Sequence, residues 1–392
     1  MIKYDLIVVG AGILGTSHAL QAARLGKKVL LLEKDNYPTG ATVRNFGQVV
    51  PSGLSGRWQR YGQRSVELYK EIQAEFDITV RANGSVYVAS DEEEWQLAQE
   101  AEVLFRQKDY PIQLLNQEDT LLQHPYLQPS YVKGSVYFPE DVSVEPDRLV
   151  HRLIQYLQQK YEVIYLPNTA VLDCVPAAAG VEVVTARREK YFGSRLLVCS
   201  GGEFRLLFPE IFASSGLVVS KLQMLQTSAL PQIKLACNIL TGLTLRRYES
   251  FEECPSFARL TTPSHYQELK KWGIHLLFKQ ATDGSVIIGD SHEYAPADRV
   301  DELGFDVKEY INELILREAE RIVTFPVRGM ARSWAGYYAQ HPDDILELEP
   351  APGLHIITGI GGKGMTSSLG YAEERVQEWF GTSAGTPGTT ST

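Results

Sequence analysis

The first forty residues alternate between two apolar runs and one amphipathic segment. Residues 6–9 form a continuous apolar, β-branched run, which is typical of a strand buried on both faces. Residues 13–25 carry apolar side chains at helical spacing, and residues 28–32 form a second apolar run. This part of the chain therefore predicts a strand, a helix and a second buried strand.

The same two patterns continue along the chain. Helical periodicity predicts further helices over about 55–76, 91–107 and 147–157, and a last one that ends near 380. Apolar runs predict strands over 84–89, 134–138, 162–165, 195–199 and 354–358, with a β-meander over 170–186. We expect several alternating strands between 216 and 324. There, Asp283-Gly284 is a strong turn signal between strands over 274–278 and 286–288.

Composition and charge narrow the class of protein. At 392 residues the chain is long enough for two domains, and 44% apolar with 22% charged residues is ordinary for a globular enzyme. The net charge of −10 argues against a nucleic-acid binder.

No apolar stretch reaches the roughly 18 residues of a membrane span. The first apolar run ends at Gly10, too early for a signal peptide, and the four cysteines form no C-x-x-C pair. We expect a cytoplasmic protein with reduced thiols and no metal site.

A G-x-G-x-x-G motif joins the first strand to the first helix. Gly10 permits the tight turn, Gly12 allows the backbone to approach a pyrophosphate, and Gly15 allows close packing of helix and strand. The helix start favours phosphates, and Glu33, at the end of the second strand, can accept hydrogen bonds from a ribose diol. These residues predict a dinucleotide site and leave NAD and FAD both open.

Further segments carry a resemblance to a known family. They are Thr42–Gly47, Val198–Gly202, Trp334-Ala335-Gly336 and Gly359–Gly364, and they follow Gly10–Gly15 and Glu33 in the family's order. With them the chain resembles the D-amino acid oxidase-like family of FAD-dependent amine oxidoreductases, which includes glycine and sarcosine oxidases. The resemblance covers all but the tail. It implies an α/β fold in which an antiparallel-sheet substrate domain is inserted into a Rossmann-like FAD domain.

The resemblance also implies domain bounds and a cofactor site. Residues 1–80, 143–215 and 325–380 would form the FAD domain, 81–142 and 216–324 the substrate domain, and 381–392 a disordered tail. No Cys lies near Trp334 and no His lies within 39–47, so we expect noncovalent FAD. The implied FAD contacts are Gly10, Ala11, Gly12, Ile13, Leu14, Gly15, Glu33, Lys34, Thr42, Val43, Arg44, Asn45, Gly47, Val171, Ser200, Gly201, Gly202, Gly359, Gly361, Gly362, Lys363, Gly364 and Met365.

A narrower likeness concerns the substrate. Val43–Gly47, Gly242–Leu245, Gly273–His275 and Gly289–Tyr294 are similar to a subgroup linked to phosphonate breakdown. The resemblance implies oxidation of an aminophosphonate, such as N-methyl-2-aminoethylphosphonate, to phosphonoacetaldehyde. In such chemistry a hydride leaves the amine α-carbon for flavin N5 and water hydrolyses the imine. The site then needs to position the substrate and hold its anion.

Several residues are candidates for that work. Lys363 and His292 are the candidate catalytic residues. Lys363 lies in the implied flavin loop, where it can act on the ring, on oxygen or on the substrate anion. For a phosphonate, the candidate cations are Arg44, Arg247, Arg332, Lys363 and His292. The candidate substrate-binding residues are Arg44, Arg247, Arg332, Trp334, Tyr337, Tyr338 and His275. Each has a structural alternative: Arg44 as an FAD contact alone, Arg247 as a surface charge, Arg332 in an ion pair, and His275 and the three aromatic residues in packing.

Two other functions stay open at this point. A glycine, sarcosine or D-amino acid oxidase would hold a carboxylate with one Arg, whereas several converging cations would favour a phosphonate. A flavin-binding electron-transfer subunit would have no substrate of its own. If the protein oxidises an aminophosphonate or an amino acid, oxygen or another electron acceptor then reoxidises the flavin.

Overall fold

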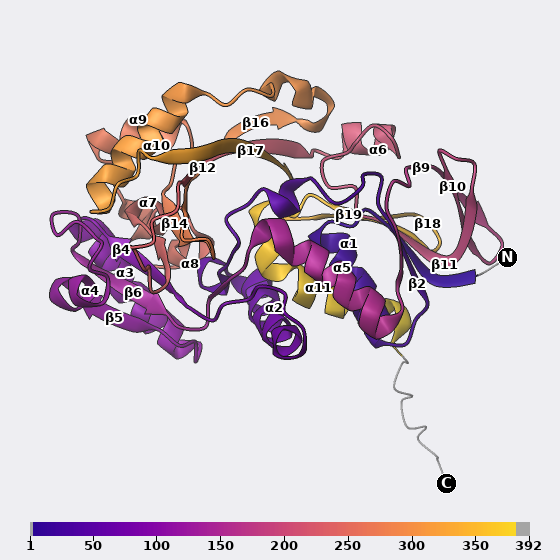
Figure 1. The fold of residues 1–392 in the computed structure, drawn as a ribbon, viewed down its shortest axis with the longest axis horizontal. Helices are drawn as coiled ribbons and strands as arrows, with labels where there is room; N and C mark the ends of the chain where they lie inside the picture. The colour runs from indigo at the N-terminus through magenta and orange to yellow at the C-terminus, as the bar shows by residue number, and fades with distance from the viewer. Residues whose placement is uncertain (1–2, 382–392) are drawn as a thin grey trace, which may run out of the picture.

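In the computed structural model, residues 3–381 are described, and they form two lobes, each built on one large sheet (Figure 1). Residues 382–392, which make up nearly all of the predicted tail, lie outside the described part. The first lobe contains an eight-stranded sheet with the order β18 (Leu346–Ala351), β19 (Leu354–Thr358), β11 (Lys190–Val198), β1 (Lys3–Val9), β2 (Val29–Leu32) and β8 (Ile164–Leu166), to which β10 (Gly180–Thr185) and β9 (Val171–Ala177) are added beside β11.

The middle of this sheet is parallel. β1 pairs in parallel with β2 and β11, and β11 pairs in parallel with β19. Val9, the last residue of β1, lies opposite Leu32 and Val198 in the two neighbouring strands. The loops that follow these strands therefore meet at one edge of the sheet, the place where open α/β sheets bind ligands. The predicted Rossmann-like arrangement is confirmed.

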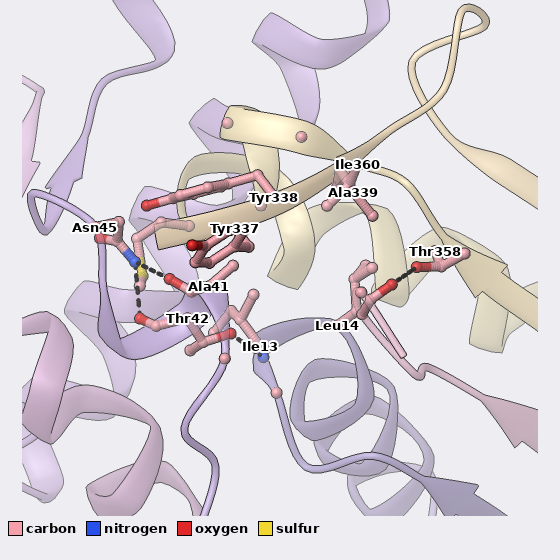
Figure 2. A pocket seen from close by; sticks show the side chains of 18 of the residues that line it. Ile13, Leu14, Ala41, Thr42, Asn45, Tyr337, Tyr338, Ala339, Thr358 and Ile360 are labelled. Atoms are coloured by element: carbon pink, nitrogen blue, oxygen red, sulfur yellow. Dashed lines mark hydrogen bonds between the residues drawn. The ribbon is translucent and has the colours of Figure 1, made fainter. Parts of the chain in front are cut away.

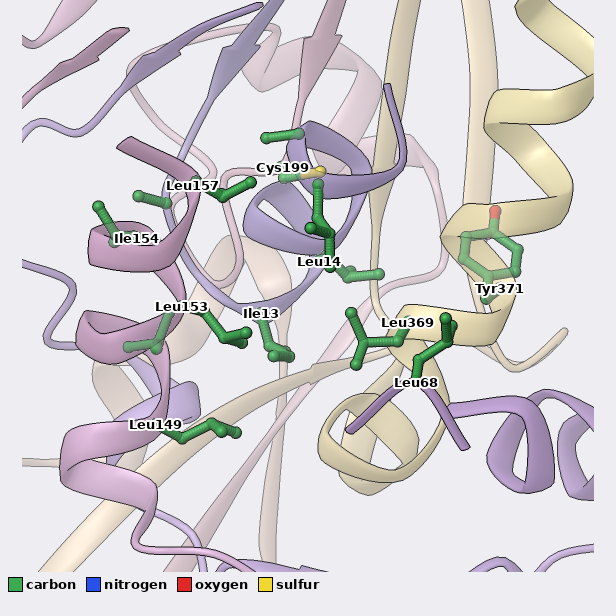
Figure 3. Packing of buried hydrophobic residues seen from close by; sticks show 14 of the residues in the cluster. Ile13, Leu14, Leu68, Leu149, Leu153, Ile154, Leu157, Cys199, Leu369 and Tyr371 are labelled. Atoms are coloured by element: carbon green, nitrogen blue, oxygen red, sulfur yellow. The ribbon is translucent and has the colours of Figure 1, made fainter. Parts of the chain in front are cut away.

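Four helices cover one face of the parallel strands: α1 (Ile13–Arg24), α2 (Gly56–Glu75), α5 (Pro146–Tyr161) and α11 (Gly364–Phe380). Figure 3 shows the packing, in which Ile13 and Leu14 of α1 lie between Leu153 of α5 and Leu369 of α11. These side chains are apolar and almost fully buried. Their burial ties the helix that follows the glycine motif to the sheet.

The second lobe is a nine-stranded, mostly antiparallel sheet. Its order is β16 (Glu293–Pro296), β12 (Val218–Thr227), β15 (Val286–Gly289), β14 (Leu277–Gln280), β13 (Asn238–Leu240), β4 (Ser85–Ala89), β6 (Gly134–Phe138) and β5 (Gln113–Asn116), and β17 (Met330–Gln340) pairs with the other edge of β12. The antiparallel β14–β15 hairpin predicted around Asp283-Gly284 is confirmed, although β14 begins at Leu277 rather than at 274.

Two features of this lobe differ from the sequence analysis. The segment 216–324 contains helices as well as strands, of which the longest is α10 (Glu309–Ile322). Its buried residues Ile311, Ile315 and Ile322 follow a helical period, which the expectation of alternating strands overlooked. Residues 330–340 were expected in the FAD domain. They form β17, which pairs with nearly the whole length of β12 in the second lobe. Each strand thereby supplies antiparallel partners for the backbone groups of the other.

The remaining described elements are shorter or peripheral. A small sheet pairs β3 (Gln48–Val49) with β7 (Val142–Ser143). None of the helices within residues 3–381 is both long enough and apolar enough to cross a membrane. The other helices are α3 (Glu92–Gln107), α4 (Gln117–Gln123), α6 (Pro209–Ser214), α7 (Gly242–Leu245), α8 (Glu249–Glu252) and α9 (Gln267–Lys271), with 3-10 turns η1 (Ala41–Val43), η2 (Pro51–Gly53), η3 (Phe257–Arg259), η4 (Ser264–Tyr266), η5 (Ala297–Leu303) and η6 (Gly361–Lys363).

Candidate active site

One cavity of about 650 Å³ runs from the carboxyl edge of the parallel strands to the second sheet (Figure 2). Its volume is in the range typical of ligand and cofactor sites. Most of the residues predicted to contact FAD line it, and they come from every predicted segment: Gly10, Gly12, Ile13, Leu14, Gly15, Glu33, Lys34, Thr42, Asn45, Gly47, Val171, Ser200, Gly201, Gly202, Gly359, Gly361, Gly362, Lys363, Gly364 and Met365.

The glycine motif has the geometry that its spacing predicts. Gly10 has a φ of +100°, and a Cβ there would lie 2.2 Å from the carbonyl oxygen of Cys199. A Cβ on Gly15 would lie 1.9 Å from the carbonyl oxygen of Gly10. Helix α1 begins after Gly12 without a side-chain cap, and Thr42 Oγ1 accepts the N–H of Ile13 at 3.0 Å. The helix start thus faces the cavity with little protein covering it, as an anion site requires.

Glu33 lies beside the glycine motif and also lines the cavity. Its Oε2 accepts the N–H of Ala11 at 3.0 Å, and its Oε1 accepts the N–H of Asp35 at 3.1 Å. Each carboxylate oxygen can accept a second hydrogen bond, so a ribose diol can still be bound. Ala11 itself is fully buried and does not line the cavity. The backbone N–H of Ala11 holds the Glu33 carboxylate in place, whereas the prediction made Ala11 a contact of FAD.

The loop after β2 is held by Asn45. Its amide donates to the carbonyl oxygens of Thr42 at 2.7 Å and Ala41 at 3.3 Å, and its Oδ1 accepts the N–H of Gly47 at 2.7 Å. Figure 2 shows Asn45 and Thr42 on the same side of the cavity as Ile13. This loop therefore connects the helix start to the second lobe.

Val43 and Arg44 lie outside the lining of the main cavity, contrary to prediction. Val43 lines a separate cavity of about 460 Å³. The Arg44 guanidinium donates to the carbonyl oxygen of Ala335 at 3.4 Å, and the Arg44 carbonyl oxygen accepts from Trp334 Nε1 and Tyr338 OH. Arg44 thus joins its loop to β17, because the turn at Ala41–Val43 directs it toward that strand.

Lys363 occupies the loop before α11, but two carboxylates surround its ammonium group. Nζ lies 2.7 Å from Asp344 Oδ1 and 2.7 Å from Glu249 Oε1. Burial alone would lower the pKa of Lys363, but these two hydrogen bonds outweigh it and the pKa lies above its usual range. A cation neutralised in this way is poorly suited to bind a substrate anion, which was one of the predicted roles.

The far end of the cavity contains a cluster of polar side chains from the second lobe. Arg247, His275, Asp290 and His292 all line it. His275 Nε2 lies 3.0 Å from Asp290 Oδ1, and the ligand atoms of His275, Asp290 and His292 lie within 4.8 Å of one another. This spacing would also suit a metal ion, which the cysteine pattern alone did not suggest.

Burial determines the protonation of this cluster. It lowers the pKa of His292 to about 3 and also lowers that of His275, so both imidazoles are neutral at pH 7. Burial would raise the pKa of Asp290, but His275, His292 and Arg247 outweigh it and the pKa is lowered. At neutral pH the cluster therefore contains one carboxylate and two neutral rings.

The predicted substrate-binding residues of β17 line two different cavities. Tyr337 and Tyr338 line the main cavity. Trp334 and Arg332 instead line the cavity of about 460 Å³, where Arg332 Nε donates to Gln226 Oε1 at 2.5 Å and stacks on the Trp334 ring. Arg332 and Trp334 come from the first half of β17, and Tyr337 and Tyr338 come from its second half. The structure therefore places Arg332 and Trp334 outside the lining of the main cavity, apart from Tyr337 and Tyr338.

Several lining residues were missed by the sequence analysis, and three of them lie close in the chain to Arg247 or His292. Asp290 lies within the segment Gly289–Tyr294 but was not named as a candidate, and Tyr248 and Glu249 were not considered. Tyr248 and Glu249 directly follow Arg247 in the chain, so the proximity of one polar and one aromatic residue to that Arg was an available signal.

Comparison with known families identifies the protein class. The family model described as FAD dependent oxidoreductase, DAO, matches residues 5–377. The chain belongs to the DAO family of FAD-dependent oxidoreductases. The match covers both lobes, so the inserted second sheet is part of the family fold. The predicted FAD cofactor and enzyme class are confirmed at this level.

Individual relatives of this DAO family member are distant. An opine oxidase subunit of Rhizobium meliloti is 24% identical over 88% of this chain and 84% of its own length. Glycine oxidase from Geobacillus kaustophilus has the same fold with a TM-score of 0.75, at 18% identity over 98% of this chain and 96% of its own. L-α-glycerophosphate oxidase from Mycoplasma pneumoniae, solved with FAD bound, has a TM-score of 0.74 at 17% identity, over 97% and 96% of the two chains.

The cavity of this DAO family member fits FAD on its own features. Ser200 Oγ is buried without a hydrogen-bond partner among the described residues, and Ser200 lines the cavity beside Gly201 and Gly202. The starts of α1 and α11 both border it without side-chain caps. A ligand with a pyrophosphate and several polar edges would satisfy these groups.

Proposed function

We propose that this protein oxidises a small amine that carries an anionic group. The observation that carries the proposal is the position of Arg247 in the same cavity as the FAD-binding segments. Bound FAD supplies the two-electron acceptor for the amine α-carbon, and the imine that forms is hydrolysed by water. The residues of the chain bind and orient the amine.

Arg247 is distinguished from the other cations of the cavity by its partners. Among the described Lys and Arg side chains that line the cavity, Lys34 pairs with Asp35 and Lys363 pairs with Asp344 and Glu249. Arg247 donates only to the Gly273 carbonyl at 3.4 Å and the Tyr294 hydroxyl at 3.5 Å, distances at which hydrogen bonds are weak. Its guanidinium is therefore available for bidentate binding of an anion.

The other walls of this end are aromatic or apolar. Tyr248 and Tyr338 line it together with Leu222 of β12 and Leu277 of β14. Such walls leave the charged groups as the fixed points for a polar substrate, with Arg247 exposed to solvent at this end. They support selection of a small amine by its charges rather than by a large side chain.

The number of free cations supports a carboxylate as the anion. The aminophosphonate prediction relied on several cationic or N–H donors: Arg44, Arg247, Arg332 and Lys363, together with His292. Of the four Lys and Arg residues, Arg247 lines the cavity and has no carboxylate partner within residues 3–381, Lys363 is neutralised, and Arg44 and Arg332 lie elsewhere. One guanidinium matches one carboxylate. The names of two relatives, an opine oxidase subunit and a glycine oxidase, agree with an amino acid substrate.

An aminophosphonate is the second candidate because His292 and His275 lie in the same part of the cavity as Arg247. A phosphonate dianion nearby would favour the protonated form of an imidazole. His292 could then supply a second cation, as its predicted functional role requires. This interpretation agrees with the narrower sequence likeness to the phosphonate-linked subgroup.

Anaerobic bleaching of the bound flavin tests the proposal. The panel is glycine, sarcosine, D-alanine, 2-aminoethylphosphonate and its N-methyl derivative, each mixed with the holoenzyme while the visible absorbance is followed. We expect bleaching by at least one carboxylate amine, and loss of that bleaching in Arg247→Met. Bleaching by phosphonates alone would establish the second candidate. Absence of bleaching by every compound would contradict both and favour an electron-transfer subunit.

A further inference from the structure

Asp290 is a buried carboxylate at the substrate end of the cavity. It follows β15 directly, its residue is 4% exposed, and it lines the cavity. Its backbone exchanges two hydrogen bonds with His275, so the two side chains leave adjacent strands side by side. His275 Nε2 lies 3.0 Å from Asp290 Oδ1, and His292 Nδ1 lies 4.0 Å from it.

This carboxylate lacks a full cation as a partner. Among the described residues, no Lys or Arg nitrogen lies within 4.0 Å of it, and the two neighbouring imidazoles are neutral at pH 7. Its Oδ1 is buried and has no hydrogen bond of normal geometry within the described part of the chain, although His275 Nε2 lies 3.0 Å away. A buried ionised carboxylate is costly unless a cation or hydrogen-bond donors satisfy it.

The tautomer of His292 follows from its own hydrogen bond. Its Nδ1 lies 3.0 Å from the Gly273 carbonyl oxygen, which can only accept, so Nδ1 carries the proton. That proton is used by Gly273 and does not reach Asp290. The two histidines therefore fix the position of Asp290 by packing while its charge is left for another partner. Their rings stack with centroids 5.6 Å apart.

We propose that Asp290 binds the ammonium group of the substrate, and that His275 and His292 are positioning residues for its carboxylate. This inference rests on the proposed function, since it assumes an amine substrate. Arg247 and Asp290 then recognise opposite charges in one cavity. The site selects molecules that carry both an amine and an anion, and a molecule with one of the two binds weakly.

Equilibrium binding of three compounds of one shape tests this assignment without turnover. The probes are tert-butylamine, tert-butanol and pivalate, and binding is followed by the change in the flavin absorbance of the holoenzyme. tert-Butylamine has no hydrogen on the carbon next to nitrogen, so the flavin cannot oxidise it there. In the unmodified protein we expect tert-butylamine to bind at least about 10-fold more tightly than tert-butanol.

Two variants separate the two charges. Asp290→Asn should weaken tert-butylamine by at least about 10-fold and leave pivalate unchanged, whereas Arg247→Met should do the reverse. Asp301→Asn, at an exposed ion pair with Arg205 outside the cavity lining, is the matched control and should change neither. Equal effects of Asp290→Asn on both probes, or no effect on either, would overturn the assignment.

Other outcomes are also decisive. If Asp290→Asn does not retain FAD, the comparison of tert-butylamine with tert-butanol in the unmodified protein decides, and equal affinities overturn the proposal. A stoichiometric divalent metal in the purified protein, lost from Asp290→Asn, would also overturn it and assign the cluster to the metal. A last outcome separates the two proposals. If no amine bleaches the flavin, but tert-butylamine still changes the flavin absorbance and Asp290→Asn weakens its binding, the proposed function is wrong and the cation site at Asp290 is supported.

Discussion

Glu249 Oε1 lies 2.7 Å from the ammonium group of Lys363, so a short helix of the second lobe contacts the loop that precedes α11. Asp344 binds the same ammonium group at 2.7 Å from the turn between β17 and β18. Lys363 thus joins three segments around the cavity. Its position explains why a Lys lies in a loop of glycines without being free for substrate.

Lys363→Met should therefore weaken structure more than substrate binding. It leaves two carboxylates without their cation, and we expect a loss of about 1–2 kcal/mol in the free energy of unfolding, since both carboxylates are partly exposed to water. FAD affinity should fall as the loop loosens, whereas the affinity of the holoenzyme for pivalate should stay unchanged. Urea unfolding and FAD titration measure the first two effects.

The control for this variant is Lys34→Met. Lys34 also lines the cavity, but its ion pair with Asp35 is exposed on both sides, so its loss should change stability by less than about 0.5 kcal/mol. A Lys363→Met protein with unchanged stability and a weakened pivalate complex would show that Lys363 binds the substrate anion after all.

Arg247→Met should abolish recognition of the substrate anion. Because no carboxylate of the described residues pairs with this guanidinium, its removal costs the fold little and costs the complex a charge-assisted contact. We expect the dissociation constant of an anionic substrate to rise about 100-fold, with FAD content unchanged. Arg332→Met, in the separate cavity, should change substrate affinity by less than about twofold. Equal effects of the two variants would refute the assignment.

Gly15→Ala should prevent formation of the FAD site. The added Cβ would lie 1.9 Å from the Gly10 carbonyl oxygen, a backbone atom that cannot move aside, and 3.0 Å from Val8 Cγ1. We expect destabilisation of about 3 kcal/mol and little bound flavin. Gly329→Ala, where nothing lies within 4 Å of the new Cβ, should be close to neutral. Thermal unfolding and the ratio of flavin to protein absorbance measure both variants.

Asp141 should make stability depend on pH. It is fully buried, accepts from Ser52 Oγ at 2.5 Å and from Tyr110, and burial raises its pKa to about 7. Its pKa in the unfolded chain is near 3.8, so the native state binds the proton more tightly. The stabilisation is complete below about pH 3.8 and is lost as pH rises through about 7.

Asp141→Asn removes this dependence and should be more stable than the unmodified protein above pH 7. We expect the advantage to grow between pH 5 and 8 by roughly 1–3 kcal/mol, measured by urea unfolding at each pH. Curves for the two proteins that stay parallel over this interval would contradict the prediction.

FAD should be released completely when the protein is denatured. Cys199 is the cysteine that lines the cavity in the described structure, and burial raises the pKa of its thiol well above the usual range. A protonated thiol is a poor nucleophile for covalent attachment. Acid precipitation should leave all the flavin in the supernatant, and flavin retained in the protein pellet would refute this.

Much of the FAD lobe was predictable because its signals are local. Gly10, Gly12, Gly15 and Glu33 lie at short spacings within one strand–helix–strand unit, and each has a backbone reason to be there. Apolar runs and helical periods likewise record burial along the chain, which is why α1, α2, α5 and the β14–β15 hairpin lie close to their predicted bounds. The amphipathic period of α10 was present too, but we assigned its segment to strands.

The sequence alone determined the dinucleotide-binding unit, its family resemblance and the segments that border the cavity. Only the tertiary structure decided which side chains meet at the substrate end. Leu277 pairs with Gly289, and the same register continued along the hairpin would place Ser291 opposite His275. Instead, His275 exchanges backbone hydrogen bonds with Asp290. A shift of one residue changes which side chain faces the cavity, and long-range packing rather than local pattern sets that shift.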